Sequence, residues 1–145
     1  MSDWGNDRIQ VFDSNGAYLD SWGLSGKEEG QLFTPTGVKV DSEGNVWVVD
    51  RGNSRVQKFT RDGEFLATWG AAGDDQGQFG VPTSIAFDSD GNFYVSEVEN
   101  SRVQIFNSEG GNTYPILLRR HSPIPTAWLS TAMETSMWLI RETIS

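Results

Sequence analysis

The 145-residue sequence contains no cysteine, a single histidine and no long apolar run. Without cysteine the chain can form neither a disulfide nor a thiolate zinc site. No stretch of about 18 apolar residues occurs, so no membrane-spanning helix is expected. The start, MSDWGNDR, has no apolar segment, and no signal peptide is expected there.

Basic residues are also scarce, with 11 Lys and Arg against 20 Asp and Glu, which gives a net charge of −9. An acidic surface repels phosphate backbones, so nucleic acid is an unlikely partner. The hydrophobic content of 37% and the length indicate a soluble, globular chain with room for one ordinary domain.

A repeat with a period of 47 residues is the dominant feature of the chain. The segment Asn6–Phe12 (NDRIQVF) returns as Asn53–Phe59 (NSRVQKF) and again as Asn100–Phe106 (NSRVQIF). Other features keep the same step, such as Trp22-Gly23 with Trp69-Gly70 and Gly44-Asn45 with Gly91-Asn92. Periods of this size are typical of propellers, solenoids and repeat arrays.

One repeat unit alternates short apolar strands with tight turns. Four strands are predicted, at Gly37–Asp41, Asn45–Asp50, Arg55–Thr60 and Glu64–Trp69. A Gly-, Asp- and Gln-rich link then leads to the next unit. Four antiparallel strands joined by tight turns make one propeller blade. The predicted fold is therefore all-β: a partial β-propeller with an irregular C-terminal tail.

The segments PTGVKVDSEGNVWVVDRGNSRVQKF and PTSIAFDSDGNFYVSEVENSRVQIF resemble NHL repeats, the blades of six-bladed β-propellers. The resemblance covers residues 3 to about 110 in register. It predicts a partial blade and link at 1–34, a complete blade and link at 35–81, and an incomplete blade at 82–110. The first copy lacks two strands, so we expect the N-terminus to lie inside a blade.

Two sets of residues are candidates for function or for stability. Turns between the second and third strands should share one face with the links, and such loops usually carry binding function. The candidate ligand-binding residues are Trp4, Asn6, Arg51, Asn53, Glu97, Glu99 and Asn100; the alternative is that they are solvated turn residues. Ion pairs within blades are expected between Asp3 and Arg8, Asp50 and Arg55, and Glu97 and Arg102.

The resemblance implies a non-enzymatic scaffold that binds a protein or small ligand through its loops. No catalytic residue, metal site or cofactor is predicted. The alternative is a fragment of a six-bladed propeller enzyme, of the lyase or lactone hydrolase type, with its metal site in other blades. Self-association through open blade edges is a further expectation, because unpaired edges invite pairing.

The composition changes after residue 110: of 16 glycines only Gly111 follows, and no aspartate does. Shifting the codons back by one base turns Met133-Glu134 into a forced glycine and Met137-Trp138 into a forced valine. Residues 131–143 can then decode as DGDGNVYVADTGN, close to the blade sequence. We therefore expect residues 111–145 to be an out-of-frame translation of the next blade, with no domain of their own.

Sequencing the coding DNA tests this expectation. The alternative frame should encode a GVAVD-like strand followed by a turn and a second strand. A frame without those residues would contradict a frameshift and favour a divergent natural tail.

Overall fold

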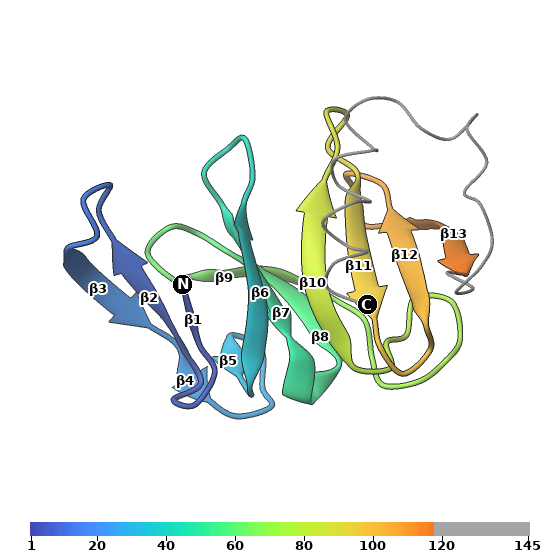
Figure 1. Ribbon diagram of the computed structural model, residues 1–145, viewed down its shortest axis with the longest axis horizontal. Helices are drawn as coiled ribbons and strands as arrows, with labels where there is room; N and C mark the ends of the chain where they lie inside the picture. Colours follow the sequence, from blue (N-terminus) through green and yellow to red (C-terminus); the bar gives the residue numbers. More distant parts are fainter. Residues whose placement is uncertain (118–145) are drawn as a thin grey trace.

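The computed structural model describes residues 1–117, which form three antiparallel sheets standing side by side (Figure 1). The first sheet contains β1 (Ser2–Asp3), β2 (Arg8–Phe12) and β3 (Tyr18–Trp22). The second contains β6 (Pro35–Val40), β7 (Val46–Asp50), β8 (Arg55–Phe59) and β9 (Phe65–Trp69). The third contains β10 (Pro82–Phe87), β11 (Phe93–Glu97), β12 (Arg102–Phe106) and β13 (Asn112–Leu117).

The links between sheets carry a little regular structure of their own. In the first link β4 (Leu24–Ser25) pairs in parallel with β5 (Gln31–Leu32), and the second has a parallel bridge from Ala72 to Phe79. A short 3-10 helix, η1 (Arg51–Asn53), turns the chain between β7 and β8. Among the residues described, no helix has the length and apolar character that a membrane span needs.

The second and third sheets repeat one another in register. Val46 opposes Phe59 in one sheet, and Phe93 opposes Phe106 in the other. The hairpin between β6 and β7 turns on Asp41, whose Oδ1 accepts hydrogen bonds from two backbone amides of the turn. Equivalent residues therefore occupy equivalent places, and each sheet is one four-stranded propeller blade.

An aromatic cluster joins the second blade to the third. The Trp47 and Trp69 rings stack with centroids 4.6 Å apart, and Phe93 stacks on Phe106 at 4.8 Å. Trp47 also meets Phe93 at 4.8 Å, so the cluster crosses from one blade to the other. Stacked and tilted rings at these separations add to the free energy gained by burial.

A smaller aliphatic and aromatic cluster joins the first blade to the second. Its buried members are Ile9, Leu32, Val46, Val48 and Phe59, with Trp22, Val38 and Phe65 packed against them. The central strand β7 is buried along its whole length, because one of its faces meets each cluster. Each blade thus depends on its neighbours for burial.

The structure changes two of the predicted blade boundaries. β1 supplies part of a second strand to the first blade, in the register that Val49 and Asp50 have in the next blade. β13 completes the third blade as far as Leu117, beyond the predicted end at residue 110.

The hairpin turn explains why β13 forms. Asn107 Oδ1 accepts hydrogen bonds from the amides of Glu109 and Gly111, and Gly110 takes a positive φ of 85°. This turn directs the chain back along β12, where pairing uses main-chain groups whatever the side chains. The rest of the predicted out-of-frame tail, 118–145, lies outside the described residues.

Phe12 and Phe59 occupy the same repeat position but differ in burial, which provides a matched test. Phe59 is fully buried beside Trp22, with centroids 4.9 Å apart, whereas Phe12 is 37% exposed. Phe59→Ala should lower the free energy of unfolding by about 3–5 kcal/mol, and Phe12→Ala by much less. Urea denaturation followed by tryptophan fluorescence measures both; equal losses would contradict the observed packing.

Candidate functional site

The turns of the blades separate onto two opposite edges of the molecule. In Figure 1 the turns after β1, β7 and β11 lie along the lower edge together with the links. The hairpin turns after β2, β6 and β10 lie along the upper edge. We call the lower edge the loop face, defined by residues 3–7, 51–54, 98–101 and the links at 23–34 and 70–81.

Behind the loop face, each blade carries a cluster of polar side chains around one carboxylate. In the second blade Asp50 is fully buried. Its oxygens accept hydrogen bonds from the Phe33 amide (2.7 Å), Asn53 Nδ2 (2.8 Å), Arg55 Nε (2.8 Å) and Gln57 Nε2 (3.1 Å). The buried charge is therefore both paired and fully hydrogen-bonded, as burial of a carboxylate requires.

The same side chains hold the preceding link by its main chain. Arg55 donates from Nη1 to the carbonyl of Lys27 (3.0 Å), and from Nη2 to those of Glu28 and Gln31 (both 2.8 Å). Gln57 donates to the Gln31 carbonyl and accepts from the Gly30 amide. The guanidinium presents its donors in a fixed fork, which suits it to several carbonyls at once.

The third blade repeats this arrangement with a glutamate in place of the aspartate. Glu97 pairs with Arg102 and accepts from Gln104 and Asn100. Arg102 donates to carbonyls of the second link, which are those of Asp74, Asp75 and Gln78. Each partner lies 47 residues beyond its counterpart, so the cluster is a property of the repeat.

The structure thus brings together all three predicted acid–arginine pairs. In the first blade Arg8 Nε lies 2.9 Å from Asp3 Oδ2, and the Asp3 pKa is held below its usual range by hydrogen bonds from Arg8 and Asn6. The glutamines Gln10, Gln57 and Gln104 were not predicted to take part. The sequence signal for them was a glutamine that recurs with the 47-residue period in the strand after each loop-face turn.

The predicted ligand-binding residues divide into two groups. Asn6, Asn53, Asn100 and Glu97 belong to the carboxylate clusters; Glu97 is buried, Asn53 and Asn100 are half-buried, and Asn6 is exposed. The asparagine side-chain amides are used by the carboxylates, and a ligand-binding role for these four residues stays a prediction. Trp4, Arg51 and Glu99 are exposed on the loop face, and so is Val98.

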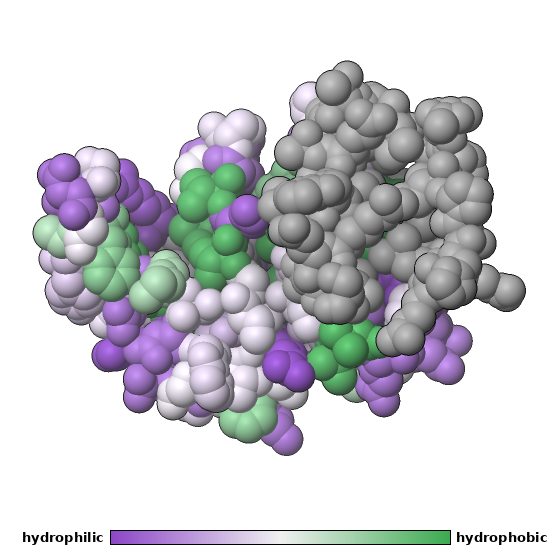
Figure 2. All heavy atoms as spheres, in the orientation of Figure 1, coloured by the Kyte–Doolittle hydropathy of each residue, from purple (hydrophilic) through white to green (hydrophobic). Residues whose placement is uncertain are grey.

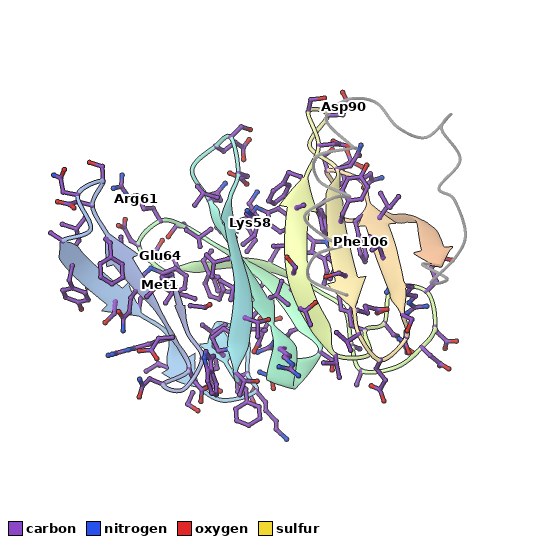
Figure 3. The ribbon with its side chains drawn as sticks, in the orientation of Figure 1. Met1, Lys58, Arg61, Glu64, Asp90 and Phe106 are labelled. Atoms are coloured by element: carbon purple, nitrogen blue, oxygen red, sulfur yellow. The ribbon has the colours of Figure 1, made fainter. Side chains whose placement is uncertain are left out.

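The upper edge carries clefts at the two blade junctions. One of about 370 Å³ lies between the first and second blades, bordered by Met1, Phe12 and Arg61. Figure 3 shows Met1 and Arg61 near one another, to the left of β6. Apolar residues gather over β6 beside it in Figure 2, where Val40 is 60% exposed.

The second cleft, of about 390 Å³, lies between the second and third blades. Lys58 reaches into it, with Nζ 3.1 Å from Asp41 Oδ2 and 5.1 Å from the centre of the Trp47 ring. Burial raises the Asp41 pKa, but hydrogen bonds from Trp47, Asn45 and Lys58 outweigh it and lower the pKa to about 2. Lys58 therefore pairs with Asp41 and Glu43 in this cleft, while Asp88 accepts hydrogen bonds from Asn92 and Tyr94.

Metal binding has no visible basis in the part of the chain that the structure describes. No three His, Cys, Asp or Glu side chains gather there as they would around an ion. The inner strands β6 and β10, which read PTGVKV and PTSIAF, contain none of these residue types. A metal site of the lyase type would therefore need ligands from outside residues 1–117.

The blades, their register and their links define the chain as part of a β-propeller. The NHL repeat model matches residues 34–59 and 79–106, so the second and third blades of the chain contain NHL repeats. No curated protein matches it.

Solved structures with the same fold include two lyases. A virginiamycin B lyase from Staphylococcus aureus, solved with quinupristin, is 18% identical with a TM-score of 0.59, covering 86% of this chain and 37% of that one. A streptogramin B lyase is 20% identical with a TM-score of 0.58, and the match covers 85% of this chain and 36% of that one. A putative exported protein from Bacteroides fragilis is 18% identical with a TM-score of 0.59, and the match covers 86% of this chain and 36% of that one. The chain spans just over a third of the length of these propellers.

Arg55 and Arg8 provide a matched pair for testing the clusters. Arg55→Met leaves Asp50 buried without its cation and frees the link, which should cost about 3–5 kcal/mol. Arg8→Met removes the same group from a side chain that is 42% exposed, and should cost about 1 kcal/mol or less. Thermal unfolding measures stability, and hydrogen exchange should rise at residues 26–33 only in Arg55→Met; unchanged exchange there would contradict the arrangement.

Proposed function

We propose that the chain is a non-enzymatic propeller scaffold that binds a protein partner through its loop face. The observation that carries this proposal is that recurring and variable turn residues have different places in the structure. Those that recur in every copy are used by the carboxylate clusters, whereas those that differ between copies stand exposed at the same edge.

The exposed positions are chemically unlike one another. Trp4 in the first copy corresponds to Arg51 in the second and to Val98 in the third. Glu99, which follows Val98 in the sequence, is also exposed. A surface that combines an aromatic ring, an arginine and a carboxylate is suited to a partner of mixed character, since Trp and Arg dominate binding hot spots. The clusters behind the face keep the turns fixed, which lowers the entropy cost of binding.

Panning a random peptide display library on the immobilised chain tests this proposal. Enriched peptides should bind the double variant Arg51→Ser/Glu99→Ser at least about tenfold more weakly, because two hot-spot contacts are lost. The matched control is Arg61→Ser/Glu64→Ser, which removes the same two charges from exposed positions in the turn between β8 and β9, away from the loop face (Figure 3).

Peptides that discriminate in the opposite sense, or not at all, would contradict a binding role for the loop face. Failure to enrich any peptide would count against it in the same way.

A further inference from the structure

Two positions on the loop face exchange a large and a small side chain between the second and third blades. The Phe33 ring lies against Gly52, where an added Cβ atom would collide with it. One period later Gly80 stands in place of Phe33, and Glu99 stands in place of Gly52. The main chain pairs in the same way in both blades. The Gly52 amide donates to the Phe33 carbonyl (2.8 Å), and the Glu99 amide donates to the Gly80 carbonyl (3.3 Å).

The fold therefore does not require a ring at position 33, because a glycine forms the same contact in the third blade. The Phe33 side chain is 45% exposed, so much of its apolar area faces water on the loop face. Burying such a ring under a partner gains free energy, and aromatic side chains are frequent anchors of protein interfaces. Phe33 thus adds an aromatic anchor to the loop face that the sequence interpretation did not name.

An arginine without a partner stands beside this anchor. Arg51 directly precedes Gly52 in the turn and is exposed. Among residues 1–117, no carboxylate forms a salt bridge with it. Arg55 and Arg102, in contrast, each donate to three main-chain carbonyls of a link. The Arg51 guanidinium has the same fork of donors and can hold carbonyls of a bound segment.

Exposed carboxylates outnumber cations around the anchor. In the links and turns of the second and third blades the exposed acids are Glu28, Glu29, Asp74, Asp75 and Glu99, and the exposed cations are Lys27 and Arg51. The clusters fix the main chain at the tips of both links, because Arg55 holds the Glu28 carbonyl and Arg102 holds those of Asp74 and Asp75. These acids are therefore held in place before a partner arrives, and their potential attracts a basic one.

We propose that the loop face binds an extended basic segment of a partner protein, with an aliphatic side chain of that segment seated on Phe33. Arg51 donates to main-chain carbonyls of the segment, and the carboxylates of the two links pair with its lysines and arginines. The inference rests on the proposed function and deepens it, since it assigns the anchor and the charge of the partner.

The labelled peptide acetyl-GRKGLGKRG-amide, with one leucine between two basic pairs, provides the probe. Fluorescence anisotropy of the peptide is measured while the full 145-residue chain is titrated in. We expect saturable binding that Phe33→Ser weakens about tenfold or more, because the anchor is lost. The matched control is Leu66→Ser in β9, which removes a side chain of similar exposure, 47%, and should leave the affinity unchanged. A peptide with glycine in place of leucine should lose as much affinity as Phe33→Ser does.

A second pair of variants tests the charge of the partner. Asp74→Asn/Asp75→Asn should weaken binding about tenfold at low ionic strength and reduce its dependence on salt, because exposed charges are screened. Asp62→Asn/Glu64→Gln removes two exposed charges from the turn between β8 and β9 and should change neither.

Retained affinity in Phe33→Ser, equal losses in the two charge variants, or no saturable binding would each overturn the proposal. Library peptides that depend on Arg51 and Glu99 but carry no basic residue would overturn it as well, while leaving the binding role of the loop face intact.

Discussion

A carboxylate placed at the end of the second strand of every blade is the constraint on which the rest of the structure depends. Asp50 and Glu97 are fully buried, and a buried charge requires a cation and hydrogen-bond donors around it. The arginine five residues later and the glutamine seven residues later satisfy that requirement within the blade. Their remaining hydrogen-bonding groups then attach the preceding link, so one polar cluster sets the turn, the link and the loop face together.

The hydrophobic clusters between blades have a different role from the polar clusters. They bury the flat faces of the sheets, and the aromatic rings of Trp47 and Phe93 meet at the second junction. Such packing tolerates some sliding of one sheet over another, whereas directional hydrogen bonds do not. The polar clusters therefore specify how each link lies against its blade, while the apolar faces supply the stabilising free energy.

The first blade shows the same chemistry without a covering link. Its apolar side is also open, with Phe12 37% and Tyr18 59% exposed. Self-association through open blade edges stays a prediction, and these rings supply a physical basis for it.

Much of the fold could be predicted because the repeat provides three independent copies of each signal. The strands β7, β8 and β9 lie within one residue of the ranges expected from alternation and turn residues. The ion pairs were predictable because an acid and an arginine recur five residues apart. The glutamines and the short parallel strands of the links were not predicted, since their role is to contact main-chain groups that leave no pattern in side-chain identity.

By itself, the sequence determined the blade unit: its 47-residue period, its four strands and the residues that recur in every copy. The tertiary structure decided which of those recurring polar residues are buried and which stand in solvent. Asn53 and Arg51 are two residues apart in one turn, yet one holds a buried carboxylate and the other is exposed. The physical reason is that burial is produced by the link and the neighbouring blade, which approach from positions distant in the chain. The tertiary structure also decided that the third blade is completed beyond residue 110. The turn after β12 brings β13 alongside it, and β12 pairs with β13 through its main-chain groups.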